Sequence, residues 1–409
     1  MTIAGKSFDA GSMRTAVDAS HDWRTTTIAV VFDIGARDES NRQHGVIHLL
    51  EHVLLIQSPP DRLSLIDSVY SKGGECNGST GHEETVFWIR VQHVHAEQVI
   101  KQMMKALLAA NFDHEQVDRE RFIISEELLG TRHDNYETGF RKFTRLLMGT
   151  HPFTRAIGGT ATSVRHLDSA LVEQMYVDQF LNSPMGVAIV TGADMAAPIE
   201  DALQEACQDF SSSNTLREKT RTAPVPSRER RVQIASKRTR GFLFVGGLGF
   251  SRHHRLWAAS EVLAELLSGA PQSDLYLALR VEARLAYDFS AYHDTYTDSG
   301  LWVCAVETSR DNASHIAGIV EGLVQRTARQ AFDIPRIEAA KNRLFAAFDF
   351  SLDHPIERAE SLALSLVRND GPEWIDPVLI DADAVAGVTP EDVADAAQEV
   401  LTSWTVCFS

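Results

Sequence analysis

The amino-acid sequence repeats its own pattern once. Residues 112–127, FDHEQVDRERFIISEE, align without a gap with residues 332–347, FDIPRIEAAKNRLFAA. The surroundings repeat as well: each half has a β-rich run (26–36 and 241–250), a second strand (84–91 and 299–308) and then a long amphipathic helix. Self-similarity over half a chain indicates a duplicated structural unit, which limits the chain to folds built from two similar halves.

Strands followed by helices that return in pairs predict an α+β fold. We expect two homologous α/β sandwich domains, each a mainly antiparallel sheet with helices packed on one face. The length of 409 residues agrees with two domains. Residues 211–231, SSSNTLREKTRTAPVPSRERR, are polar, contain two prolines and show no apolar periodicity, so they predict a linker. The expected domains are therefore residues 1–210 and 232–409.

Composition excludes several classes of protein. Hydrophobic residues make up 44% and charged residues 23%, as in soluble globular proteins, and no apolar run approaches the roughly 18 residues of a membrane span. The first 15 residues, MTIAGKSFDAGSMRT, lack an apolar export signal, so we expect a cytoplasmic protein. A formal net charge of −17 argues against nucleic acid as a partner. The four cysteines contain no CxxC pair and are expected to be free, buried thiols.

The segment GVIHLLEHVLL carries a pattern of metal-binding residues. It places His48 and His52 four residues apart with Glu51 between them, in a run rich in helix-forming residues. On a helix the three side chains project from one face. Two imidazoles one turn apart can bind zinc, and the carboxylate beside them can act as a general base on water. A five-residue H-x-x-E-H match also arises by chance, so the motif alone leaves that alternative open.

A catalytic zinc site needs a third protein ligand. Glu127 is the candidate, 75 residues after His52, and Glu120 lies two turns earlier on the same helical face. Glu120 would orient a ligating histidine through its other ring nitrogen. In the repeat, alanines 347 and 340 stand where Glu127 and Glu120 stand, and no histidine occurs in the corresponding helix at 255–269. The chemistry is therefore expected in the first half.

These residues resemble the pitrilysin and insulinase family of inverzincin metallopeptidases, which also contains the mitochondrial processing peptidase. HLLEH, with SEELL downstream, is similar to the family's zinc motif, which implies Zn²⁺ ligands His48, His52 and Glu127 and a general base, Glu51. Three more segments resemble family segments: GARDES (35–40), GGECNGSTGHEET (73–85) and HPFTRAIGGT (151–160). After HLLEH the chain continues VLLIQSPPDRLS, where the family has an aromatic residue and Gly-Thr, so the neighbouring subsite wall is not implied.

The resemblance also assigns substrate-binding residues. The second half contains R-x-E-x-x-L-x-Y, in which Arg280 and Tyr287 match the arginine and tyrosine that the family brings to its active site. A guanidinium and a phenol can stabilise the oxyanion that forms at the cleaved carbonyl. The alternative is that Arg280 is a surface ion-pair residue and Tyr287 a packed aromatic. Asn77 matches an asparagine on the strand that borders the family's cleft, although beside Gly78 it also suits a turn.

The resemblance implies a zinc metalloendopeptidase that hydrolyses unfolded peptides or small precursors within a chamber, with Glu51 as the general base. A chain of two such units is expected to form a homodimer, or a heterodimer with a related subunit. The alternative is a peptidase-like subunit that binds peptide or scaffolds a complex without cutting. A zinc-binding regulator is disfavoured because Glu51 would then have no task. The sequence does not name the substrate.

Overall fold

The computed structural model describes residues 13–57, 63–131, 135–208, 219, 221–225, 231–234, 238–329, 334–368 and 377–409. The chain divides into two compact units, and neither is contiguous in sequence. The first unit contains the chain up to Leu129, Arg155–Lys219 and Ser351–Pro377. The second contains Gly130–Thr154, Thr220–Phe350 and Val378–Ser409. This division differs from the predicted domains 1–210 and 232–409, because each unit takes in a segment from the other half. Most of the predicted linker lies outside the described residues.

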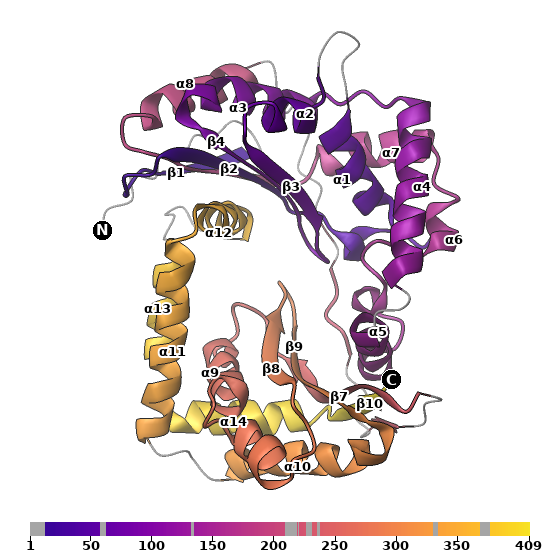
Figure 1. Ribbon diagram of the computed structural model, residues 1–409, viewed down its shortest axis with the longest axis vertical. Helices are drawn as coiled ribbons and strands as arrows, with labels where there is room; N and C mark the ends of the chain where they lie inside the picture. The colour runs from indigo at the N-terminus through magenta and orange to yellow at the C-terminus, as the bar shows by residue number, and fades with distance from the viewer. Residues whose placement is uncertain are drawn as a thin grey trace. The chain divides into compact units, whose positions relative to one another are not determined.

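The first unit is built on a five-stranded sheet in the order β1-β5-β2-β4-β3 (Figure 1). Only β1 and β5 pair in parallel. The strands are β1 (Met13–Asp18), β2 (Thr25–Phe32), β3 (Glu75–Thr80), β4 (Thr85–Gln92) and β5 (Met185–Val190). β-Branched and aromatic residues dominate β2 and β4, which favours strands. Strand β3 ends the sheet order, so only one of its edges pairs with a strand of the described chain.

The helices of the first unit gather mainly on one face of this sheet. The short ones are η1 (Ala36–Asp38), α2 (Leu65–Tyr70), α6 (Ala161–Val164), α7 (Ser169–Met175) and η3 (Tyr176–Phe180); the longer ones are α1 (Val46–Ile56), α3 (His93–Leu108), α4 (His114–Thr131) and α8 (Ala196–Cys207). Helix α3 buries Val99, Met103 and Leu107 at a helical spacing. These side chains join the sheet residues in one core.

Helix α12 (Pro355–Arg368) packs against the opposite face of the same sheet, although it comes from the second half of the sequence (Figure 1). Its Leu362 and Ala363 pack with Ala29 and Val31 of β2. Arg358 Nε lies 2.7 Å from Asp18 Oδ2, and both side chains are only 3% exposed. A paired, buried charge of this kind is costly to break because the remaining partner stays desolvated.

The second unit repeats this architecture, with a sheet in the order β6-β10-β7-β9-β8. The strands are β6 (Arg231–Gln233), β7 (Arg240–Gly249), β8 (Phe289–Thr295), β9 (Gly300–Ser309) and β10 (Thr405–Phe408). The helices are α5 (Asn135–Met148), η2 (Pro152–Thr154), α9 (Trp257–Ser268), η4 (Tyr276–Glu282), α10 (Arg310–Arg329), α11 (Ile334–Leu352), α13 (Pro377–Ala386) and α14 (Pro390–Leu401). Again one pair of strands, β6 and β10, is parallel and the other pairs are antiparallel.

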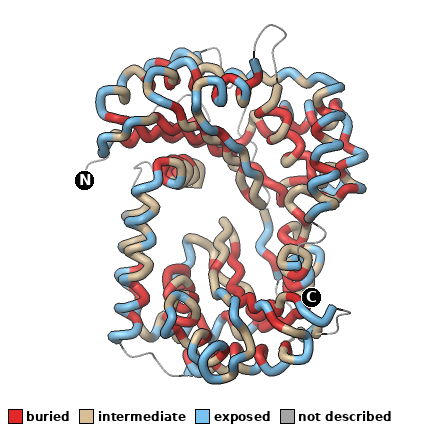
Figure 2. The backbone as a smooth tube through the Cα atoms, viewed as in Figure 1, coloured by how far each residue is buried: buried red, intermediate tan, exposed pale blue. Residues whose placement is uncertain are grey.

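The matching strand orders confirm the predicted duplication and the α+β fold. In both sheets the central strands are buried (Figure 2). Helices pack on one face of each sheet as predicted, and α12 covers the second face of the first sheet in addition. Helix α5 does the same in the second unit, where Phe143 and Leu147 pack with Phe244. Each covering helix belongs to the other half of the sequence, which a repeat pattern cannot reveal.

Candidate metal centre

Helix α1 carries three of the predicted site residues. Its apolar residues, such as Leu49, Leu50 and Val53, are fully buried, which fixes the rotation of the helix and turns His48 and His52 towards one side. Its N-terminus is fixed as well. Gly45 precedes the helix in the left-handed region with φ 93°, a conformation that glycine adopts without strain.

Helix α4 brings the predicted carboxylates to the same place. Val117 and Ile124 are fully buried on the face that also carries Glu120, and Glu127 follows one turn after Ile124. Glu120 is only 6% exposed, whereas Glu127 is exposed. The buried valine and isoleucine thus determine which way both glutamates point.

The three predicted ligands meet. His48, His52 and Glu127 each offer a donor atom, and these atoms lie within 4.8 Å of one another. The centres of the two imidazole rings are 4.7 Å apart. Glu120 Oε2 lies 3.2 Å from His52 Nδ1, so His52 has its Nε2 left for a metal. This is the arrangement predicted for Glu120, in which a carboxylate fixes the orientation and tautomer of a ligating histidine.

The protonation state of His48 suits a metal ligand. Burial, followed by the charge of neighbouring His52, lowers the pKa of His48 to about 4, so the ring is neutral at pH 7. Its Nδ1 is buried and has no hydrogen-bond partner among the described residues. A Cβ on Gly158 would lie 2.9 Å from that nitrogen, so the backbone covers it closely. Neutral imidazoles and a carboxylate are the donors that zinc takes in peptidases, and the residues present fit this ion.

Glu51 lies beside this cluster and is 5% exposed. The hydroxyl of Thr80, on β3, donates a hydrogen bond of 3.1 Å to Glu51 Oε2. Burial raises the pKa of the Glu51 carboxyl above its ordinary value, while the charge of His52 and the Thr80 hydrogen bond act against that rise. A raised pKa brings a carboxylate closer to the range in which a general base works at neutral pH.

Three further residues support the site and were not singled out from the sequence. The carboxyl of Glu39 accepts hydrogen bonds from the backbone N–H groups of Gly45 (2.8 Å) and Ile47 (2.9 Å), at the start of α1. Burial raises the pKa of Glu39 to about 8. The other two residues are Thr80, which donates a hydrogen bond to Glu51, and Gly158, which lies close to His48. All three lie in segments that resemble the family, GARDES, GGECNGSTGHEET and HPFTRAIGGT, and that resemblance was the available signal.

Asn77 lies within β3, opposite Trp88 of β4, and its side chain is exposed. The alternative prediction of a turn residue is therefore wrong. Because β3 is the last strand of its sheet, the strand has an unpaired edge within the described chain. Such an edge can accept a peptide as an added strand.

Arg280 and Tyr287 belong to the second unit, not to the unit that holds His48. The guanidinium carbon of Arg280 lies 4.4 Å from the centre of the Tyr287 ring and 5.2 Å from that of Tyr276. Tyr287 is 78% exposed, so it is not a packed aromatic. Among the described residues, Arg280 contacts these two rings and forms no ion pair. The two side chains are presented together and remain available to a ligand.

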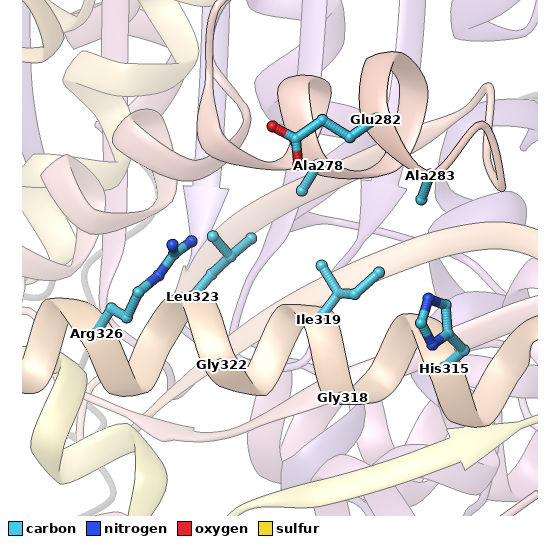
Figure 3. A pocket seen from close by; sticks show the side chains of 9 residues that line it. All are labelled: Ala278, Glu282, Ala283, His315, Gly318, Ile319, Gly322, Leu323 and Arg326. Atoms are coloured by element: carbon cyan, nitrogen blue, oxygen red, sulfur yellow. The ribbon is translucent and has the colours of Figure 1, made fainter.

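A hollow of about 620 Å³ lies elsewhere in the second unit, between η4 and α10 (Figure 3). Ala278 and Glu282 line it from η4, and His315, Ile319 and Arg326 line it from α10. It contains none of the predicted site residues.

The four cysteines are buried and free, as predicted. No helix within the described residues is long and apolar enough to cross a membrane.

The chain is similar to known peptidases. Residues 14–150 match the model of the insulinase family of peptidases (M16), and residues 176–344 match that of the peptidase M16 inactive domain. The chain is 24% identical over 404 residues to an uncharacterized zinc protease of Streptomyces coelicolor, covering 96% of this chain and 86% of the relative. It is 21% identical over 343 residues to an uncharacterized zinc protease of Bacillus subtilis, covering 83% and 82%.

The fold is also similar to that of a protease from Helicobacter pylori, with a TM-score of 0.82, 17% identity and coverage of 97% of this chain and 96% of the other. Two successive domain models of one family thus cover most of the described chain. The relatives are named zinc proteases, which is consistent with zinc as the ion that His48, His52 and Glu127 could hold. The chain belongs to the insulinase (M16) family of peptidases.

Proposed function

We propose that this protein is a zinc-dependent endopeptidase that hydrolyses unfolded peptides or small precursors. One observation carries the proposal: His48, His52 and Glu127 offer donor atoms within 4.8 Å of one another, with the buried carboxyl group of Glu51 beside them. The match to zinc protease relatives supports the same chemistry. The net charge of −17 argues against nucleic acid as a substrate, because phosphate binding needs a basic surface.

Each residue has a definite task in the proposed reaction. His48, His52 and Glu127 would hold the ion, and Glu120 would keep the His52 ring in place. Zinc, when bound, polarises the cleaved carbonyl and makes water a better nucleophile. Glu51 accepts the proton of the attacking water and returns it to the leaving amine nitrogen. Arg280 and Tyr287 would stabilise the charge on the carbonyl oxygen.

The unpaired edge of β3 would bind the substrate. A peptide added there as a strand makes main-chain hydrogen bonds, which depend little on its side chains. Asn77, exposed on this strand, would contact the peptide directly. This mode accounts for a preference for extended, unfolded substrates, because a folded protein does not offer a free strand.

Metal analysis and a cleavage assay test the proposal. The purified chain should contain about one zinc ion, and it should cleave peptides of a mixed library with cut sites readable by mass spectrometry. A chelator should abolish cleavage, and added zinc should restore it. A chain that binds zinc but cuts no peptide of the library would support the alternative, a peptidase-like subunit that binds peptide or scaffolds a complex.

The oligomeric state forms a separate part of the proposal. We propose a homodimer, because this chain has both the candidate metal ligands and the Arg280 and Tyr287 pair and so needs no second type of subunit. Light scattering of the purified chain should give twice the chain mass of 45.3 kDa. A monomer that becomes active only after a related subunit is added would indicate the heterodimer instead.

A further inference from the structure

Thr80 is the one described residue that makes a hydrogen bond to the side chain of Glu51. Its hydroxyl donates to Oε2 at 3.1 Å, and the other carboxylate oxygen, Oε1, accepts no hydrogen bond from a described residue. A glutamate has three rotatable side-chain bonds, so a free one samples many positions. A single hydrogen bond to one oxygen fixes the carboxylate and leaves the other oxygen available to water.

The backbone of β3 is shaped to bring this hydroxyl close. Gly78 lies two residues before Thr80, on the same face of the strand. A Cβ on Gly78 would lie 2.5 Å from Glu51 Oε1 and 2.9 Å from Leu55 Cδ1, so the missing side chain leaves the space that the carboxylate occupies. The strand thus approaches α1 closely at Gly78 and donates a hydrogen bond to it from Thr80.

The second unit offers an independent view of the same position. Thr80 pairs with Thr85, the first residue of β4, and Thr295 pairs with Gly300, the first residue of β9. Thr295 is therefore the counterpart of Thr80. Its hydroxyl accepts a hydrogen bond of 3.0 Å from Trp257 Nε1, at the start of α9. In both units the threonine that ends the edge strand binds a polar group of the helix that packs on it.

We infer that Thr80 is a positioning residue for the general base: its hydroxyl holds the Glu51 carboxylate in the orientation from which Glu51 accepts the proton of water. The inference rests on the proposed peptidase function. It also gives β3 two roles, since the strand whose free edge would bind the peptide is the strand that holds the base. A displaced base of this kind slows the chemical step and leaves ground-state binding intact.

The test compares Thr80→Val with Thr80→Ser in the full-length, zinc-loaded protein. Valine keeps the shape of threonine and removes the donor, so kcat for a quenched peptide should fall by about 10- to 100-fold, while KM and zinc content stay within about twofold of wild type. Serine restores the donor and should recover most of kcat. Thr295→Val is the matched control in the second unit and should leave kcat unchanged.

A kcat of Thr80→Val within about twofold of wild type would overturn the inference, as would an equal loss in Thr80→Ser. Crystal structures of wild type and Thr80→Val supply a readout that needs no activity. They should show one Glu51 carboxylate position in wild type and a displaced or split one in the variant. An unmoved Glu51 would overturn the inference even if no peptide is cleaved, whereas an inactive wild type with a moved Glu51 in the variant would count against the proposed function alone.

Discussion

The two units place different chemistry at one and the same position, where the first long helix meets the edge strand. In the first unit, α1 and β3 bring together Glu51 and Thr80 beside the small Gly78. In the second unit His293 occupies the place of Gly78, because it lies two residues before Thr295. Its side chain is fully buried and fills this place with a ring.

His293 of the second unit and His48 of the first differ in whether their ring nitrogens have hydrogen-bond partners. His293 Nε2 accepts a hydrogen bond of 2.9 Å from the backbone N–H of Phe250, and its Nδ1 lies 3.1 Å from Glu261 Oε1. Both ring nitrogens of His293 are therefore occupied within the fold. In contrast, His48 Nδ1 is buried without a partner among the described residues. A histidine becomes a candidate ligand when folding leaves one of its nitrogens unsatisfied, and a structural residue when folding satisfies both.

The largest effect is expected when a zinc ligand of the first unit is replaced by the residue that the second unit has at the matching position. Glu127→Ala copies Ala347 and removes one of the three ligands, so zinc affinity should fall by more than about 100-fold and cleavage should be lost. Metal analysis after dialysis and the quenched-peptide assay measure both. Ala347→Glu is the converse control. It should create no second zinc site, because α9 has no histidine, and a second bound zinc ion would contradict the comparison.

Removing the base while keeping the ligands should have the next largest effect. Glu51→Gln should lower kcat by about 10³-fold or more with zinc retained, because the amide cannot accept the proton of water. Glu261→Gln, the acid on α9 that pairs with His293, is the matched control and should leave kcat nearly unchanged. Normal turnover by Glu51→Gln would remove Glu51 from its proposed role.

A smaller effect is expected when Glu120 is replaced by alanine, the residue that the second unit has at the matching position, 340. Glu120→Ala removes the carboxylate from His52 Nδ1 and should weaken zinc binding by about 10- to 100-fold, a typical cost for a residue that orients a metal ligand. Saturating zinc should recover most of the activity. Titration with a competing chelator measures the affinity, and unchanged affinity would show that His52 needs no such support.

The second unit is also proposed to contribute to catalysis through Tyr287. Tyr287→Phe keeps the ring against Arg280 and removes the hydroxyl, so kcat/KM should fall by about tenfold, less than the roughly 10²- to 10³-fold loss of a preorganised oxyanion donor because the Arg280 guanidinium remains. Zinc content should not change. Tyr70→Phe, at another exposed tyrosine, is the control. Equal activity of both variants would restrict the second unit to a structural role.

The smallest effect on activity is expected at Glu39, which caps α1. Its substitution should instead change how the stability of the fold depends on pH. Burial raises the pKa of Glu39 from 4.5 to about 8, so the folded state holds this proton more tightly than the unfolded state. Its contribution to stability is complete below pH 4.5 and is lost as the pH rises through 8. Glu39→Gln cannot titrate. Urea unfolding of metal-free protein should therefore show a smaller loss of stability between pH 5 and pH 8 than wild type, by a few kcal/mol, on the order given by linkage. A parallel pH dependence would contradict this.

Features that depend on local spacing could be predicted from the amino-acid sequence. Strand and helix patterns identified two strands and a long amphipathic helix in each half, since these patterns follow from which side of an element faces the core. The four-residue spacing of His48 and His52 set both imidazoles on one side of a helix. The alanines of the repeat, together with the family resemblance, added Glu127 and Glu120. The described structure brings those four side chains together.

Contacts between residues far apart in the chain could not be predicted in this way and became known from the folded structure. Thr80 meets Glu51, and Glu39 meets the N-terminus of α1, because the sheet and its helices are packed at particular distances that no periodicity encodes. The assignment of α5 and α12 to the opposite unit is of the same kind. An amphipathic helix shows in its sequence that it needs an apolar surface, but packing selects which of two similar sheets supplies it.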